Sequence, residues 1–254
     1  MILGHHGMLG NAALRYFKDK AEILTTELRW QNNDFKIFLI TTPVDFIINC
    51  IGAIPQKAYA PNDFHVINVN LPKFLSILDA KVIHPSTDCE FSGDLPFPHK
   101  YQKNDVKDGE DPYGKSKITT SDLIEKEFHN TKAIRTSIIG HETTEKKYSL
   151  LEWFLTQNEA NGYTNHYWNG ITTLQWAKIA QNIMNDWDNY DRITQVGTEG
   201  YSKFALLYYI KNAYRINIKI NPYRTDKTVN RMLLTDFSVP DILTQLIELR
   251  EFYK

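Results

Sequence analysis

The sequence predicts an α/β fold in which a doubly wound parallel sheet is followed by a smaller C-terminal α/β lobe. Apolar runs with strand character alternate with segments of helical periodicity, an order typical of parallel strands with helices on both faces. The run at 44–51 is almost continuously apolar, as in a strand buried on both faces. A glycine-rich turn joins the first short strand to the first helix.

The same patterns place elements along the whole chain. Strands are expected at 2–3, 22–28, 44–51, 81–84, 133–139, 163–168, 193–196 and 216–220. Helices are expected where apolar residues recur at helical spacing, at 9–17, 64–78, 173–187, 203–214 and 240–252. Two more helices are expected after the N-cap residues Asp111, which precedes Pro112, and Ser149, which forms a capping box with Glu152.

Composition excludes several classes of protein. With 254 residues and 42% hydrophobic residues, the chain can bury a core without a disulfide or metal. The net charge of −1 provides no basic excess for nucleic acid, and no apolar run is long enough to span a membrane. Cys50 and Cys89 are expected to be free thiols, and no basic, then apolar, leader opens the sequence. We therefore expect a cytoplasmic protein that binds neither nucleic acid nor membrane.

The turn at 4–10 (GHHGMLG) fits the pattern G-x-x-G-x-x-G. It ends a strand and opens a helix, where glycines let backbone N–H groups approach a pyrophosphate at the positive end of the helix. The alternative is a tight turn without a ligand. His5 and His6 are expected to flank the turn and no metal site is expected, because adjacent histidines do not easily converge on one ion.

A residue that discriminates between cofactors is expected roughly 20 positions beyond the turn. Glu27 and Arg29 both lie there. An acidic residue would hydrogen-bond the ribose diol of NAD(H), whereas an arginine would accept the 2′-phosphate of NADP(H). Arg29 favours NADP(H), NAD(H) remains possible, and two solvated charges at a strand end are the alternative.

Tyr113 and Lys117 form a Y-x-x-x-K pair that shares one face of a helix. An ammonium beside a phenol favours the phenolate and suits it to acid–base work on a carbonyl or alcohol. Tyr16 and Lys20 show the same spacing, but they follow the glycine turn directly, where a solvated face is expected. Tyr113 instead follows the strand that ends before Thr87, whose hydroxyl could lie beside the phenol.

Several segments together resemble the extended short-chain dehydrogenase/reductase family, above all its dTDP-4-dehydrorhamnose reductases and their sugar-nucleotide relatives. The segments are the glycine turn, 45–52 (DFIINCIG), 86–93 (STDCEFSG), 113–117 (YGKSK), 135–137 (RTS) and, more loosely, 230–233 (NRML). The most specific is 86–93, in which Glu90 replaces the family's usual apolar residue. Pro85 also departs from the family pattern, and we expect the strand before Thr87 to end early.

The resemblance implies a Rossmann-like fold and hydride transfer from NAD(P)H to C4 of a nucleotide-linked 4-keto-6-deoxysugar. It implies that Tyr113 donates the proton, that Lys117 lowers the tyrosine pKa and holds the nicotinamide ribose, and that Thr87 hydrogen-bonds the carbonyl. It further implies cofactor contacts from Gly4, His6, Gly7, Met8, Leu9, Gly10, Arg29, Asp34, Cys50, Ile51, Gly52, Asn68, Tyr113 and Lys117. Substrate contacts are expected from Thr87, Asp88 and Arg231.

Residues 1–140 are expected to form the dinucleotide-binding Rossmann domain. Residues 141–254 are expected to form mainly the substrate-binding lobe, partly interwoven with the first domain because no linker separates them. A homodimer is possible by resemblance. Two alternatives remain: a non-catalytic NAD(P)-binding regulatory subunit, which the short first strand and the short crossover at 29–43 would suit, and a nucleotide-sugar epimerase or dehydratase.

Overall fold

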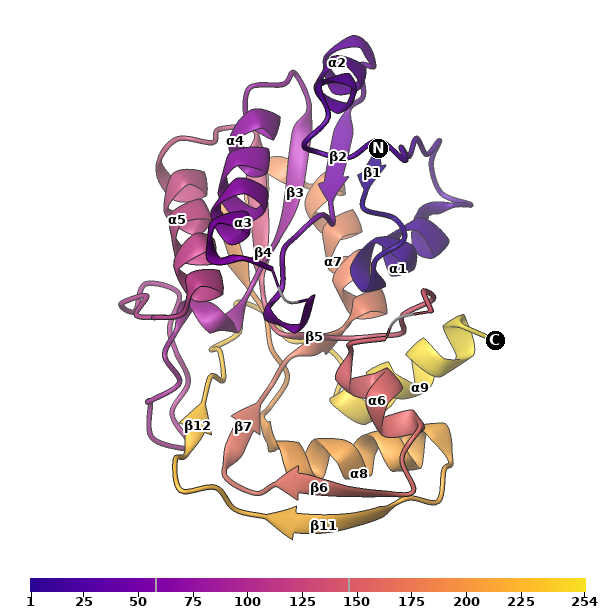
Figure 1. Cartoon of the computed structure of the whole chain (residues 1–254), viewed down its shortest axis with the longest axis vertical. Helices are drawn as coiled ribbons and strands as arrows, with labels where there is room; N and C mark the ends of the chain where they lie inside the picture. The colour runs from indigo at the N-terminus through magenta and orange to yellow at the C-terminus, as the bar shows by residue number, and fades with distance from the viewer. Residues whose placement is uncertain (58, 146) are drawn as a thin grey trace.

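The computed structural model describes residues 1–57, 59–145 and 147–254. Its central sheet has five parallel strands in the order β1-β2-β3-β4-β9 (Figure 1). These are β1 (Ile2–Leu3), β2 (Phe46–Asn49), β3 (Lys81–Ser86), β4 (Thr131–Arg135) and β9 (Ile193–Gln195). The predicted doubly wound parallel sheet is thereby confirmed.

Helices cover both faces of this sheet. One face carries α1 (Met8–Phe17) and α7 (Thr173–Asn185); the other carries α2 (Asn33–Thr41), α3 (Pro61–His65), the π-helical turn η2 (Val66–Asn70), α4 (Leu71–Leu75) and α5 (Pro112–Lys126). Successive strand side chains point to opposite faces. Ile48 therefore packs with α1 and α7, whereas its neighbour Ile47 packs beneath α2, α3 and α4.

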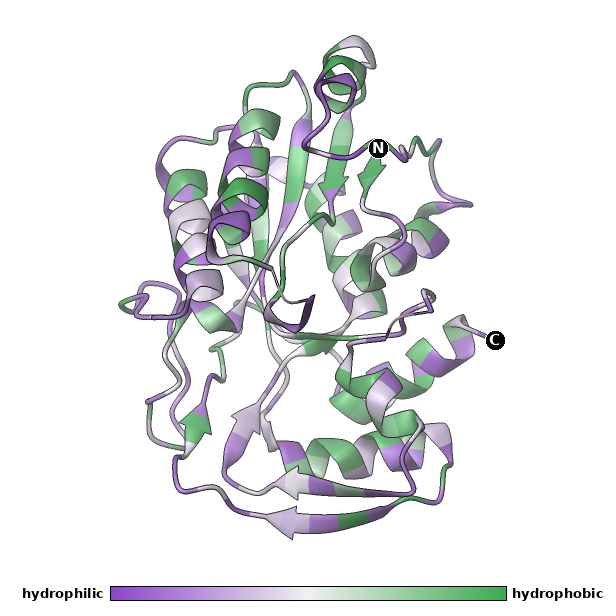
Figure 2. Ribbon diagram, in the orientation of Figure 1, coloured by the Kyte–Doolittle hydropathy of each residue, from purple (hydrophilic) through white to green (hydrophobic). Residues whose placement is uncertain are grey.

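The remaining elements form a lobe beneath the carboxyl end of the sheet (Figure 1). Its helices are α6 (Leu150–Leu155), α8 (Lys203–Tyr214) and α9 (Ile242–Phe252), and they share one apolar core. Short strands complete it: β6 (Glu159–Tyr163) with β11 (Lys219–Tyr223), β7 (His166–Trp168) with β10 (Tyr201–Ser202) and β12 (Val229–Asn230), and β5 (Ile138–Ile139) with β8 (Ile171–Thr172). Figure 2 shows β1 and β2 in hydrophobic colours, whereas much of β11 is hydrophilic.

The two halves of the chain interleave. Both α7 and β9 lie beyond residue 140, and yet β9 is a strand of the central sheet and α7 packs on one of its faces. Three 3₁₀ turns, η1 (Pro55–Lys57), η3 (Asp88–Glu90) and η4 (Trp187–Asn189), complete the assignment of the described residues. Within those residues, no helix has the length and apolar character needed to cross a membrane. The functional division at residue 140 stays a prediction.

Four local predictions were wrong. The segment 22–28 is not a strand; a hydrogen bond from the Ile2 amide to the Leu24 carbonyl (2.9 Å) sets it beside β1, without a regular ladder. The expected helix at 64–78 divides at η2, and the expected strand at 133–139 divides into β4 and β5. Pro85 does not end its strand early, because it pairs in register with Ile134 and β3 continues to Ser86.

Candidate functional site

The glycine turn is shaped by the close approach of its own backbone. Gly4 adopts φ +75°, a left-handed conformation that favours glycine. A Cβ on Gly10 would lie 2.2 Å from the Gly4 carbonyl oxygen, so α1 packs against the turn only without a side chain there. Gly7 is the N-cap of α1 and offers no side-chain acceptor, which leaves the amides of Met8 and Leu9 available to an anion.

The turn lies at the point where the strand order reverses. After β1 and α1, the segment 22–28 lies along one side of β1, where the Ile2 amide donates to the Leu24 carbonyl. The next strand, β2, pairs with β1 on its other side. The Cys50 amide donates to the Leu3 carbonyl (2.9 Å), which places Cys50, Ile51 and Gly52 directly beyond β2 at the same edge of the sheet. In open α/β sheets, ligands bind outside the carboxyl ends of the strands at such a point.

Asn68 connects the segment after β2 to α5. Its side-chain oxygen accepts from the Ala53 amide (2.8 Å), and its amide nitrogen donates to the Ala53 carbonyl (3.1 Å) and the Ser116 hydroxyl (3.0 Å). Asn68 is buried and lies in η2, a type of helical irregularity that is frequent at functional sites. Because Ser116 lies between Tyr113 and Lys117 on α5, Asn68 positions both.

Thr87, directly after β3, and Tyr113, on α5, are brought together. Burial raises the pKa of the Tyr113 phenol, and the nearby Thr87 hydroxyl acts in the opposite direction. Desolvation outweighs the other influences on this pKa, and the lowering effect expected of Lys117 stays a prediction. Tyr113 is a protonated phenol beside a hydroxyl, which suits it to donate a proton.

Lys117 is buried one helical turn beyond Tyr113, and its Nζ donates to the Pro85 carbonyl (2.9 Å). Desolvation lowers the pKa of Lys117 to about 8, and the negative charge of Glu90 opposes that change. Lys117 is thus held at the end of β3 by the backbone of Pro85, the residue that was expected to end the strand early.

Asp88 and Arg231 approach the same edge from different halves of the chain. Arg231 Nε donates to the Phe91 carbonyl (3.0 Å) and Nη2 to the Ser92 carbonyl (3.2 Å), which fixes its guanidinium against the segment after Thr87. Burial raises the pKa of Asp88, and the charges of Arg231 and Lys203 oppose the shift. The C-terminal lobe therefore contributes cations to the site.

Glu90 and Arg135 are residues whose role the sequence did not reveal. Arg135 Nη2 lies 2.8 Å from Glu90 Oε2, and neither side chain is exposed. Glu90 Oε1 also accepts hydrogen bonds from the Ser121 hydroxyl (2.5 Å) and the Ser86 hydroxyl. The signal in the sequence was the acidic residue at a usually apolar position, but its partner is not local.

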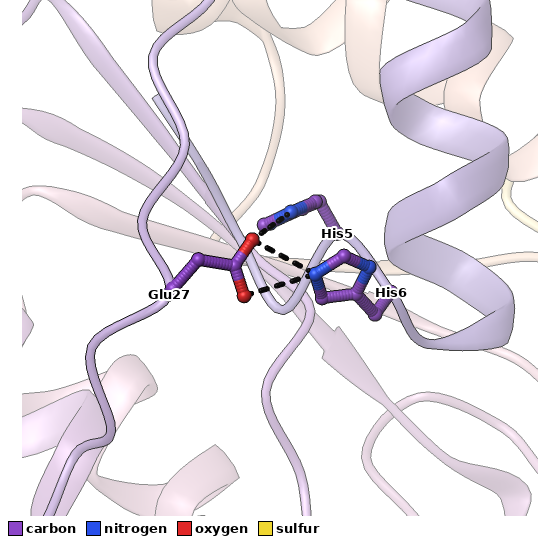
Figure 3. Close-up of side chains that lie close together, drawn as sticks. All are labelled: His5, His6 and Glu27. Atoms are coloured by element: carbon purple, nitrogen blue, oxygen red, sulfur yellow. Dashed lines mark hydrogen bonds and ion pairs between the residues drawn. The ribbon is translucent and has the colours of Figure 1, made fainter. Parts of the chain in front are cut away.

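The glycine turn has a second feature in its histidines. His5 Nε2 and His6 Nε2 lie 3.1 and 2.9 Å from Glu27 Oε1 (Figure 3). The premise that adjacent histidines do not converge was therefore wrong, because their rings lean together with centroids 4.0 Å apart. Arg29 and Asp34 are both exposed, the latter in the first turn of α2. Glu27, rather than Arg29, lies against the turn.

Fold and site together define a Rossmann-type α/β protein of the short-chain dehydrogenase/reductase kind. The glycine turn at the switch point and the Thr87, Tyr113 and Lys117 side chains at the same edge of the sheet are its defining features. The chain belongs to the NAD dependent epimerase/dehydratase family, whose model matches residues 1–141. No curated protein matches the sequence significantly.

Solved structures similar to this chain extend over its whole length. A dTDP-4-dehydrorhamnose reductase from Bacillus anthracis, in complex with NADP, has a TM-score of 0.85 at 16% identity and covers 98% of this chain and 97% of its own. A reductase of the same name from Clostridium acetobutylicum has a TM-score of 0.81 at 18% identity, covering 99% and 98%. A UDP-glucose 4-epimerase from Thermotoga maritima, with UDP-glucose, has a TM-score of 0.77 at 13% identity, covering 99% and 97%. At these identities the similarity establishes the fold.

Proposed function

We propose that this chain is an NAD(P)H-dependent reductase that acts on the C4 carbonyl of a nucleotide-linked 4-keto-6-deoxysugar. The observation that carries the proposal is the nearness of the Thr87 hydroxyl to the Tyr113 phenol at the carboxyl edge of the sheet, with Lys117 one turn further along α5. The structural similarity to reductases of dTDP-4-dehydrorhamnose supports this substrate class. The presence of all three residues, Thr87, Tyr113 and Lys117, argues against a non-catalytic regulatory subunit.

The glycine turn fits the pyrophosphate of a nicotinamide dinucleotide. A side chain on Gly10 would clash with the Gly4 carbonyl, and α1 begins without a side-chain cap among the described residues, so backbone donors face the space beside the turn. The reduced nicotinamide, when bound, supplies the hydride. The neighbouring edge has room at Gly52, beyond β2, where an added Cβ would make only ordinary contact with Asn68.

The protein groups perform the proton chemistry of the reduction. The Tyr113 phenol, kept protonated by burial, donates its proton to the carbonyl oxygen as the hydride reaches the carbon, which converts the ketone to an alcohol. The Thr87 hydroxyl orients that oxygen. Lys117, held by the Pro85 carbonyl, places a positive charge near the phenolate that remains. The C-terminal lobe holds the nucleotide sugar, with Arg231 and Asp88 at its border.

The burial of Glu90 and its ion pair with Arg135 favour a reductase over a dehydratase. A dehydratase needs an acid and a base near the threonine. Glu90 is fully buried, paired with Arg135, and hydrogen-bonded by two serine hydroxyls, so it does not face a substrate. Of the two acidic residues, Glu90 and Asp88, it is Asp88 that accepts a hydrogen bond from the Thr87 hydroxyl.

Cofactor preference depends on which charge lies at the turn. The sequence favours NADP(H) through Arg29, but the structure sets the Glu27 carboxylate against the turn. A carboxylate at this point hydrogen-bonds a ribose diol and repels a 2′-phosphate. We therefore propose NADH as the better donor, with NADPH the alternative that the cofactor assay distinguishes.

The test is oxidation of NADH and of NADPH by the purified protein in the presence of a dTDP-4-keto-6-deoxysugar, followed by absorbance of the reduced nicotinamide. Tyr113→Phe should lower kcat by about 10²–10⁴-fold, because the proton donor is lost. Tyr16→Phe is the matched control: its tyrosine has the same spacing to a lysine but donates to Gln181 between α1 and α7 (2.5 Å). Undiminished turnover in Tyr113→Phe, or no oxidation with any nucleotide 4-keto sugar, contradicts the proposal.

A further inference from the structure

His5, His6 and Glu27 bring three metal-ligating groups into one cluster (Figure 3). Their ligand atoms all lie within 4.8 Å of one another, and His6 Nε2 is 2.9 and 3.0 Å from the two oxygens of Glu27. Zinc binds imidazole nitrogen at about 2.0–2.1 Å and carboxylate oxygen at about 2.0–2.2 Å, which separates tetrahedral ligands by about 3.3 Å. The separations between each histidine and Glu27 lie close to that value.

We propose that His5, His6 and Glu27 bind a divalent transition-metal ion such as Zn²⁺. Two imidazoles and one glutamate make up a donor set that zinc uses in sites that keep one position open. The set carries a single negative charge when the histidines are neutral. In the described part of the chain, Glu27 forms ion pairs with these two histidines only, so no lysine or arginine competes for its carboxylate.

The ligands are held by two segments that are placed independently of any ion. The turn is fixed because Gly10 packs on the Gly4 carbonyl, and the segment that bears Glu27 is tied to β1 by the hydrogen bond at Leu24. The His5 side chain is 10% exposed, whereas those of His6 and Glu27 are 66% and 76% exposed. One ligand is therefore rigid, and an ion can reach the other two from solvent.

The buried ring of His5 adds a second reason. Its Nδ1 is buried and makes no hydrogen bond in the described structure, so Nε2, which faces Glu27, is the polar atom through which the ring is held. The ring is already aimed for coordination through Nε2. The cluster shares the glycine turn and Glu27 with the proposed dinucleotide site, but Thr87, Tyr113 and Lys117 take no part in it.

The test uses the metal alone. After treatment with a chelator, the full chain is titrated with Zn²⁺ by calorimetry and with Co²⁺ by absorption spectroscopy, whose d–d bands report coordination geometry. We expect one ion per chain, and at least 10–100-fold weaker binding in His6→Ala and Glu27→Gln, since even loss of an outer partner of a ligand costs about that much. His129→Ala is the matched control, because His129 is an exposed histidine beside Arg192.

Absence of binding near one equivalent overturns the proposal, as does unchanged affinity in both cluster variants or an equal loss in His129→Ala. Circular dichroism of each variant separates loss of the ligand from loss of the fold, and Glu27→Gln retains the size of the side chain. Because the titration contains no nucleotide or sugar, its outcome is independent of the proposed reductase activity.

Discussion

Arg135 and Glu90 form an ion pair in the interior of the protein, with Nη2 2.8 Å from Oε2 and both side chains fully buried. The approach is close in distance, although these two atoms do not have hydrogen-bond geometry. The pair joins β4 to the turn that follows β3, and Glu90 reaches α5 through Ser121. Glu90 also accepts a hydrogen bond from Ser86, which lies between Thr87 and Pro85, the residue whose carbonyl holds Lys117.

Removing one partner of this pair should destabilise the protein strongly. Glu90→Ala leaves the Arg135 charge buried and uncompensated, and we expect the free energy of unfolding to fall by about 3–5 kcal/mol. Urea unfolding measures the change. Lys227→Ala, which breaks an exposed ion pair with Asp94, is the control and should have little effect. The double variant Glu90→Val with Arg135→Met should be more stable than Glu90→Ala, because no buried charge remains; equal instability would contradict this account.

Lys117 should give the protein a measurable pH dependence of stability. Its pKa is lowered to about 8 in the folded protein, from an ordinary value near 10.5, so the unfolded chain binds more protons between these values. Stability must therefore rise with pH across that window, by on the order of 3 kcal/mol in total. Urea unfolding at pH 7.5 and 10 should show the rise in the native protein and not in Lys117→Met. A rise of the same size in Lys117→Met would show that other groups cause it.

The same lysine should set the alkaline limit of activity. Because burial raises the pKa of Tyr113, the phenol stays protonated at neutral and mildly alkaline pH. We expect kcat/KM to fall above about pH 8 as Lys117 loses its charge. Lys117→Arg, whose charge persists, should shift that limit upward even at reduced activity. A limit that does not move assigns the titration to another group.

Asn68 should affect activity by positioning α5. Asn68→Ala leaves the buried Ala53 amide without its acceptor, and we expect a loss of about 1–3 kcal/mol of stability, measured by thermal or urea unfolding. Because the Ser116 contact is also lost, kcat should fall while KM for the dinucleotide changes less. Thr119→Ala is the control on α5, since Thr119 is exposed and its hydroxyl donates to the Lys115 carbonyl of the same helix. Equal kcat in the two variants would contradict a positioning role.

Glu27 should control the choice between the two nicotinamide cofactors. In buffer with chelator, Glu27→Gln is expected to improve kcat/KM with NADPH relative to NADH several-fold, because the carboxylate that opposes a 2′-phosphate is gone. Arg29→Gln is the companion variant, and its effect on the ratio should be smaller. If Arg29→Gln instead abolishes use of NADPH while Glu27→Gln has no effect, the arginine decides the preference.

The sequence by itself determined the parallel sheet, the glycine turn, and the shared helical face of Tyr113 and Lys117. These follow from local physics: the periodicity of apolar residues, the backbone freedom of glycine, and the geometry of one helical turn. Segment 22–28 shows the limit of such reasoning, because β propensity cannot supply the ladder that a partner strand would have to offer.

Only the tertiary structure decided which distant groups meet. Arg231 reaches the segment after Thr87 across 139 to 142 positions of sequence, Glu90 meets Arg135, and Glu27 meets two histidines from the turn. The protonation behaviour of the site could not be predicted from the sequence either. Burial raises the pKa of Tyr113 and lowers that of Lys117, and no sequence motif encodes burial. Contacts between residues far apart in the chain depend on how whole elements pack, and spacing along the sequence does not contain that information.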